Sequence, residues 1–212
     1  MTENIEVLTH SSIRICSQEG TIYCDPYQIR ENRQDADYIF ITHDHYDHFS
    51  IEDIQKVCRE GTILIVPEKM ESKAEKVFAG VRVRTVRPGE VYEIEGLKAE
   101  TIAAYNNRKP FHPKAAGWTG YILNIDGQRI YIAGDTDFTK DMENIKCDIA
   151  IVPIGGIYTM NAKKAAEFIN TIRPAAAIPA HYGSIVGKKE DAEVFAQNVK
   201  EPVRVEIKMQ YL

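Results

Sequence analysis

Residues 42–48, Thr-His-Asp-His-Tyr-Asp-His, constrain the fold more than any other part of the chain. They bring three imidazoles and two carboxylates together directly after the apolar run at 38–41. An imidazole binds a transition metal through a neutral ring nitrogen, and a carboxylate adds a hard, charge-neutralising oxygen. Neither a protein core nor an ordinary solvated loop needs such a concentration of ligands. The segment therefore predicts a metal-binding turn at the end of a strand, with enough ligand side chains for two ions.

The remaining histidines are few, and two of them lie where loops are expected. The chain has six histidines, of which half lie in residues 42–48 and the others are His10, His112 and His181. His112, Asp135 and His181 each come just past a predicted strand, as the histidine cluster does. Catalytic residues are commonly mounted on loops that leave strands at one edge of a sheet. We therefore expect these four loops to build one site.

Short apolar segments rich in Val, Ile, Tyr and Thr run through the chain and are typical of strands. We predict strands at residues 5–8, 13–16, 21–24, 38–42, 62–66, 81–86, 91–94, 97–105, 118–125, 128–133, 148–154 and 175–180. The pair Asp126-Gly127 predicts a two-residue hairpin between two of them. Helices are predicted at 51–59, opened by Ser50, and at 67–78, 162–172 and 190–200. Elements in this order fit an α/β fold of two packed sheets with helices outside.

Size and charge limit what the chain can be. Its 212 residues can bury a sizeable core as a single domain spanning 1–212. The net charge of −5 argues against broad binding to nucleic acid or to an anionic membrane. No apolar stretch approaches the roughly 20 residues that span a bilayer, and the start lacks the features of a signal peptide. We therefore expect a cytoplasmic protein, with reduced thiols at Cys16, Cys24, Cys58 and Cys147.

The order of the candidate ligands resembles a known family. The motif His43-x-His45-x-Asp47-His48, followed by His112, Asp135 and His181, is similar to the metal signature of the metallo-β-lactamase superfamily, and the resemblance covers nearly the whole chain. Residues 9–12, 134–136, 153–156 and 179–182 resemble the branch of ascorbate-6-phosphate lactonase-like metal-dependent hydrolases. The resemblance implies a four-layer αββα sandwich. Many relatives have a histidine where this chain has Ile132, so one polar neighbour of the site is absent.

The resemblance also implies the ligand set and its chemistry. One metal would take His43, His45 and His112, the other would take Asp47, His48 and His181, and Asp135 would bridge both. Zinc suits the imidazole-rich site best, while manganese or iron would suit a site with two carboxylates. A hydroxide shared by the two metals would attack a carbonyl carbon or a phosphorus. As catalytic residues, Asp47 would orient this nucleophile, and His181 or a metal-bound water would serve the leaving group.

Three cations next to a predicted ligand indicate how a substrate is held. Arg108, Lys109 and Lys114 flank His112 and favour a substrate with a phosphate or carboxylate. The alternative for this segment is a solvated basic loop. Gly156 leads into a helix capped by Thr159 or Asn161, at which free N–H groups would bind an oxyanion, with a plain tight turn as the alternative.

The other expected substrate contacts lie close to the ligands in the sequence. They are His10, Asn106 and Tyr158. The alternatives for His10 are to orient a metal ligand or to form a structural hydrogen bond between two strands. Trp118 is expected to pack in the core, with shaping of the pocket as the alternative.

These observations together predict an enzyme, a dinuclear metal-dependent hydrolase. Its small-molecule substrate would be an anionic ester, lactone or phosphoester. An RNA or DNA phosphodiesterase of the same fold is one alternative, and a non-catalytic sensor of metal or ligand is another. No nucleic-acid or membrane partner is expected from the charge and hydropathy. The oligomeric state is left open, with a homo-oligomer as one outcome.

Overall fold

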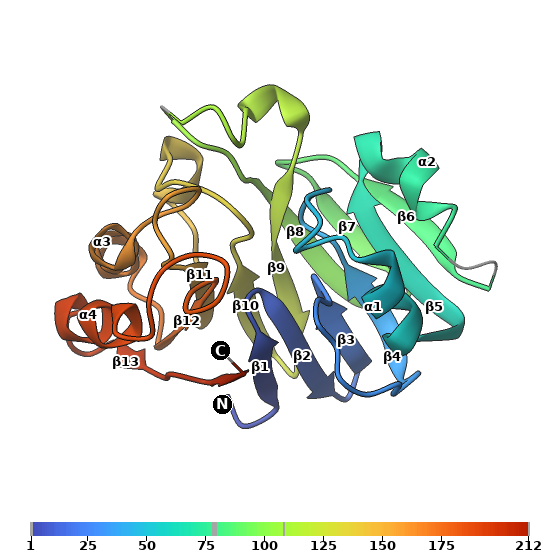
Figure 1. Cartoon of the computed structure of the whole chain (residues 1–212), viewed down its shortest axis with the longest axis horizontal. Helices are drawn as coiled ribbons and strands as arrows, with labels where there is room; N and C mark the ends of the chain where they lie inside the picture. Colours follow the sequence, from blue (N-terminus) through green and yellow to red (C-terminus); the bar gives the residue numbers. More distant parts are fainter. Residues whose placement is uncertain (1, 78–79, 108, 212) are drawn as a thin grey trace.

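Two mixed sheets of seven strands each form the centre of the protein (Figure 1). The computed structural model describes residues 2–77, 80–107 and 109–211. In spatial order, the first sheet contains β14 (Met209–Tyr211), β1 (Ile5–Thr9), β2 (Ser12–Ser17), β3 (Gly20–Cys24), β4 (Ala36–Phe40), β5 (Cys58–Pro67) and β6 (Arg82–Val86). The second contains β13 (Arg204–Val205), β12 (Ala176–Ala180), β11 (Ile149–Pro153), β10 (Gln128–Ile132), β9 (Thr119–Ile125), β8 (Leu97–Ala103) and β7 (Val91–Ile94).

Helices cover the outer faces of both sheets. The helices α1 (Ile51–Val57) and α2 (Glu71–Ala74) pack on the first sheet, and α3 (Ala162–Ile172) and α4 (Asp191–Asn198) pack on the second. Figure 1 shows the two pairs on opposite sides of the sheets, which gives the predicted αββα order. Short 3-10 turns lie at Glu68–Met70, Lys114–Ala116 and Lys140–Met142. Within residues 2–77, 80–107 and 109–211, none of the helices has the length and apolar character needed to cross a bilayer.

Alternating side chains of the strands form the core between the sheets. Ile15 of β2 and Tyr121 of β9 are both fully buried there. Side chains on the opposite faces, such as Ile39 of β4 and Ala150 of β11, pack under the helices. Because both faces of the central strands are covered, these strands read in the sequence as nearly continuous apolar runs.

Local signals place several of the element ends. Ser50 begins α1 as predicted, because its side chain accepts a hydrogen bond from the N–H of Asp53. The hairpin between β9 and β10 turns at Asp126 and Gly127, whose φ angles of 49° and 74° suit a type I′ turn. Both predictions are confirmed.

Three predicted helices end earlier than their sequence patterns indicate, and one of them is α4, which stops at Asn198 rather than at residue 200. The first stops at Val57 rather than at residue 59, because the ladder between β4 and β5 already starts with Ala36 opposite Cys58. The helix predicted at 67–78 is a 3-10 turn followed by the short α2, and residue 78 lies outside the described residues. Most of this charged segment is exposed, so little packing supports a longer helix. The sequence patterns do not predict the short strands β13 and β14, which the structure contains.

The loops after six strands meet at one edge of the sandwich. In the first sheet β3 and β4 are parallel. In the second sheet β10, β11 and β12 are parallel, and β8 shares their direction because the antiparallel β9 lies between β8 and β10. The carboxyl ends of these strands therefore deliver their loops to a common place, where the candidate ligands lie.

Candidate metal centre

The seven predicted ligands lie together as two groups joined by one carboxylate. The ligand atoms of each group lie within 4.8 Å of one another: His43, His45 and His112 form the first group, and Asp47, His48 and His181, with His10, form the second. In the first group His43 Nε2 is 3.1 Å from His45 Nδ1. In the second, Asp47 Oδ2 is 3.7 Å from the Nε2 atoms of both His48 and His181.

Asp135 lies between the two groups. Its Oδ1 is 3.3 Å from His48 Nε2 and 3.1 Å from His181 Nε2. Its Oδ2 is 3.4 Å from His112 Nε2. The carboxylate therefore turns one oxygen toward each group, as a bridging ligand would.

Four buried atoms at this point have no hydrogen-bond partner among the described residues. They are the Nε2 atoms of His48, His112 and His181 and the Oδ1 atom of Asp135. An unpaired buried polar group costs about 1–3 kcal/mol, so such a cluster calls for a missing partner. Imidazole nitrogens and carboxylate oxygens aimed at a common space are the donors that zinc and related divalent ions use. The residues therefore fit bound metal.

Hydrogen bonds at Nδ1, the ring nitrogen that does not face the other ligands, hold the imidazoles of His43 and His48 in place. His43 Nδ1 donates to Thr42 Oγ1 at 3.0 Å, and His48 Nδ1 donates to Asp25 Oδ2 at 2.7 Å. Thr42 in turn donates its hydroxyl to Asp25 Oδ2 at 2.6 Å and its N–H to Asp25 Oδ1 at 2.8 Å. These bonds fix the tautomers that leave Nε2 free to bind metal.

Asn106 and His10 hold ligands in the same way. Asn106 Oδ1 accepts a hydrogen bond from His112 Nδ1 at 3.0 Å, while its Nδ2 donates to a backbone carbonyl at 2.9 Å. His10 is fully buried, donates from Nε2 to Asp47 Oδ2 at 3.1 Å and accepts at Nδ1 from Ser184 Oγ at 3.3 Å. The side chains of Asn106 and His10, which were expected to contact a substrate, thus hydrogen-bond to predicted metal ligands instead. For His10, support of a ligand is one of the predicted alternatives.

Asp25 is a functional residue that the sequence analysis misses. It is 1% exposed. Because Asp25 directly follows β3, its position just past a strand is the sequence signal that could have identified it. Its φ of 46° lies in the left-handed region that non-glycine residues avoid, as do the φ angles of 49° at His10 and 56° at His181. Strain of this kind costs on the order of 1–3 kcal/mol per residue and clusters at functional sites.

Burial and charge set the protonation of the metal-free site. Burial lowers the pKa of His43 well below its usual range and lowers the pKa of His10 to about 4. Burial also opposes charge on His48 and His181, but the neighbouring carboxylate of Asp135 outweighs it and raises the pKa of both. These two histidines, acting against burial, hold the pKa of Asp135 well below its usual range.

We expect metal binding to release protons from His48 and His181. Their raised pKa values increase the fraction of both side chains that is cationic in the metal-free protein, and an imidazole must lose its proton before it binds metal. Metal affinity will therefore fall as the pH is lowered. Calorimetric titration in buffers of different ionisation enthalpy will show release of up to about two protons at pH 7. The variant His48→Gln should release about one fewer, and no proton release from the unsubstituted chain would contradict this protonation scheme.

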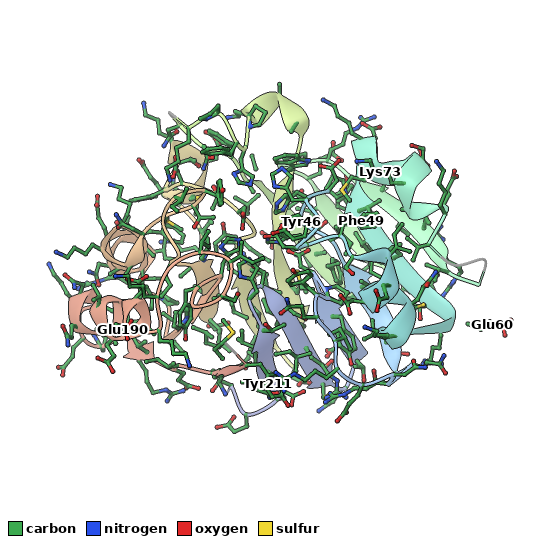
Figure 2. All side chains as sticks on the ribbon, viewed as in Figure 1. Tyr46, Phe49, Glu60, Lys73, Glu190 and Tyr211 are labelled. Atoms are coloured by element: carbon green, nitrogen blue, oxygen red, sulfur yellow. The ribbon has the colours of Figure 1, made fainter. Side chains whose placement is uncertain are left out.

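A cavity of about 290 Å³ reaches the ligands. Its lining combines residues of the metal centre with apolar and aromatic side chains, namely His45, Asp47, His112, Asp135, Tyr46, Phe111, Tyr158 and Ile185. Tyr46, labelled in Figure 2, is 65% exposed. The volume lies near the lower end of the range of about 300–1,000 Å³ for small-molecule sites. The arrangement suits a small substrate brought directly onto the metal ligands.

Two of the predicted cationic residues, Lys109 and Lys114, are not part of this lining. Lys109 Nζ donates to Asp137 Oδ1 at 2.8 Å and to a backbone carbonyl at 2.5 Å. Lys114 Nζ donates to Asp141 Oδ2 at 2.6 Å. Arg108 lies outside the described residues. The ammonium groups of the two lysines are therefore used by nearby carboxylates, and the prediction that Lys109 contacts substrate has no support in the structure.

The segment before α3 forms a closed turn rather than an oxyanion site. Gly156 donates its N–H to the carbonyl of Met160 at 3.0 Å, and the N–H groups of Thr159 and Met160 also donate to backbone carbonyls. Asn161, one of the two predicted caps, accepts a hydrogen bond at the start of α3. The N–H of Gly156 is thus occupied, whereas Tyr158 of the same segment lines the metal cavity as its predicted role requires.

Trp118 packs against ligands rather than in the core. Its ring centroid lies 5.1 Å from that of His43, 4.9 Å from that of His45 and 5.4 Å from that of His112. The half-buried indole therefore forms an apolar wall beside the first ligand group. Such a wall limits the access of solvent to a metal site.

Comparison with known proteins shows the family to which the chain belongs. The family described as Beta-lactamase superfamily domain matches residues 4–181. The chain belongs to the metallo-β-lactamase superfamily. A UPF0173 metal-dependent hydrolase from Thermoplasma acidophilum is 35% identical over 91% of this chain and 90% of its own length. One from Methanosphaera stadtmanae is 31% identical over 94% and 92% of the two chains. Within the metallo-β-lactamase superfamily, the chain is thus a metal-dependent hydrolase.

Solved structures share the metallo-β-lactamase fold. A candidate metal-dependent hydrolase from Parabacteroides distasonis superposes with a TM-score of 0.81 at 30% identity, covering 97% of this chain and 93% of that one. Igni18, a metallo hydrolase from Ignicoccus hospitalis, superposes with a TM-score of 0.76 over 98% and 96% of the two chains. At 22% identity Igni18 shows the fold alone. The αββα sandwich is confirmed, and membership of the lactonase-like branch stays a prediction.

Proposed function

We propose that this protein hydrolyses a small ester, lactone or phosphoester with two divalent metal ions. The observation that carries the proposal is the carboxylate of Asp135, which faces His112 with one oxygen and His48 and His181 with the other, at 3.1–3.4 Å. One carboxylate directed at two groups of ligands supports a dinuclear rather than a mononuclear site. Zinc suits the five imidazoles best, and manganese or iron is the alternative.

The side chains around the cavity would prepare the reaction. Bound metals of this kind supply a hydroxide at neutral pH and offset negative charge in the transition state. Asp47 lines the cavity and accepts a hydrogen bond from His10, so its carboxylate is held in position to orient an attacking water. His181 is 1% exposed and is not among the lining residues, which favours a ligand role over proton transfer to the leaving group. Water in the cavity would then protonate the leaving group.

A substrate screen of the metal-loaded protein tests the proposal. Lactones, carboxylic esters, phosphodiesters, thioesters and β-lactams are offered, and metal content is measured by elemental analysis. We expect about two equivalents of metal and turnover of an ester, lactone or phosphoester that chelation abolishes and added metal restores. Salt-dependent retention on RNA would indicate a nucleic-acid phosphodiesterase instead. Two bound metals with no turnover of any class would indicate a non-catalytic sensor.

A further inference from the structure

Four apolar or aromatic side chains, each from a different loop, form a wall of the metal cavity. Tyr46 follows β4, Phe111 follows β8, Tyr158 follows β11 and Ile185 follows β12. Three of the eight large hydrophobic side chains that are exposed on the described surface gather here, namely Tyr46, Phe111 and Ile185. Single exposed apolar side chains are common, but a cluster of them around a polar centre marks a binding surface.

Contacts among aromatic side chains hold two parts of this wall. The ring centroids of Phe111 and Tyr158 are 4.7 Å apart and the rings are perpendicular, which is a favourable edge-to-face pair. The ring of Tyr46 lies 6.1 Å from that of Tyr27 in a similar arrangement. Figure 2 shows Tyr46 among the loops near the centre of the view. The rings of Phe111 and Tyr158 thus already contact each other, and the ring of Tyr46 is held by a neighbour outside the lining, so a ligand would not have to order these three side chains.

No lysine or arginine of the described residues lines the cavity. Three lysines in or beside the ligand loops pair with a carboxylate: Lys73 with Asp44, Lys109 with Asp137 and Lys114 with Asp141. The acidic side chains of the lining are Asp47 and Asp135, which would be neutralised by bound metal. A negative group on a substrate that lies against the apolar side chains, out of contact with the metals, would therefore meet no cationic partner among the described residues. Placing a charge there without a partner is costly.

We infer that the site takes an uncharged carboxylic ester or lactone that carries an apolar group, in preference to a matched substrate whose acyl group ends in a negative charge. This inference rests on the proposed function, because the scissile group must reach the ligands. Phe111 and Ile185 contact the apolar group, and each methylene buried against them strengthens binding about fourfold. The charge preference is the reverse of the one predicted from the basic segment at residues 108–114.

Matched ligands that differ by one charge test the inference. The esters 4-nitrophenyl butyrate and mono-4-nitrophenyl succinate share a leaving group and an acyl chain length, but only the second ends in a carboxylate. We expect kcat/KM to be at least about tenfold higher for the butyrate. Binding is measured separately by calorimetry with butyrohydroxamate and succinate monohydroxamate, which present the same metal-binding group. The butyrohydroxamate should bind more tightly by a similar factor.

Substitutions of side chains in the cavity wall test which of them cause the preference for the uncharged substrate. Phe111→Ala and Ile185→Ala should each lower kcat/KM for the butyrate and affinity for butyrohydroxamate by about four- to tenfold, with smaller effects on the succinate pair. Ile185→Lys should shift the preference toward the succinate. Val91→Ala is the control, because Val91 is 63% exposed on β7 and is not part of the cavity.

The two measurements separate the inference from the function on which it rests. Equal or tighter binding of succinate monohydroxamate to the unsubstituted protein would overturn the apolar preference, whether or not esters are hydrolysed. Tighter binding of butyrohydroxamate without hydrolysis of either ester would overturn the hydrolytic role proposed for the site, while supporting the apolar preference of its wall.

Discussion

Replacing Asp135 by Asn will release metal and lower turnover about a thousandfold or more. The carboxylate turns its two charged oxygens toward opposite ligand groups, and an amide offers one neutral oxygen and an NH₂ group that cannot bind a cation. A bound metal contributes several kcal/mol to the stability of a transition state, and each 1.36 kcal/mol is a factor of ten in rate. Elemental analysis and kcat/KM on the best substrate of the screen measure the two effects.

Asp137→Asn is the matched control, because Asp137 lies two residues further along the same loop. Its carboxylate accepts a hydrogen bond from Lys109 and does not line the metal cavity. This variant should keep two metal ions and turnover close to that of the unsubstituted protein. An Asp135→Asn variant that does the same would show that Asp135 is not a bridging ligand.

Removing the carboxylate of Asp25 will weaken metal binding about 10- to 100-fold, although Asp25 is not a predicted ligand. Asp25→Ala deletes the acceptor for His48 Nδ1 and for both the hydroxyl and the N–H of Thr42. His48 then loses the bond that fixes its tautomer and its orientation. Competition with a chelator measures metal affinity, and thermal unfolding of the metal-free protein measures stability.

Asp35→Ala separates loss of orientation from general destabilisation. Asp35 accepts hydrogen bonds from Arg14 at 2.7 Å and from the Tyr23 hydroxyl at 2.8 Å, and it contacts none of the ligands. This variant should lower the melting temperature without changing metal affinity. If Asp25→Ala behaves in the same way, the proposed role of Asp25 in orienting His48 is wrong.

The positions of all predicted ligands except His112 are predictable from the sequence because they come within a few residues of the end of an apolar strand. The residues of the 42–48 segment, Asp135 and His181 come just after β4, β10 and β12. Parallel strands place their carboxyl ends at one edge, so a list of polar residues after strands is also a list of neighbours in space. The predicted αββα order follows from the same strands, because apolar runs buried on both faces require helices on the outside.

The side chains that orient the ligands hydrogen-bond to residues far away in the sequence, and no local sequence pattern shows such pairs. His48 receives its orienting bond from Asp25, which lies 23 residues earlier in the chain. The ammonium of Lys109 reaches Asp137, 28 residues later, so a basic segment beside a ligand does not become a substrate contact. The identity of a charged residue can be read from the sequence, but its partner is set by the fold.

Element ends are also decided by tertiary pairing. The strand β14 has only the three residues Met209–Tyr211, and its partners come from β1 at the other end of the chain. The strand β5 takes over at Cys58, where the sequence pattern still favours helix. Short edge strands and helix ends carry too few residues for periodicity to reveal them.

Anomalous diffraction from crystals of the metal-loaded protein, recorded at the absorption edge of the bound metal, will show whether the site holds two ions. We expect two peaks: one among His43, His45 and His112, and one among Asp47, His48 and His181, with the carboxylate of Asp135 between them. A single peak, or peaks away from these side chains, would contradict a dinuclear centre and the hydrolysis proposed from it.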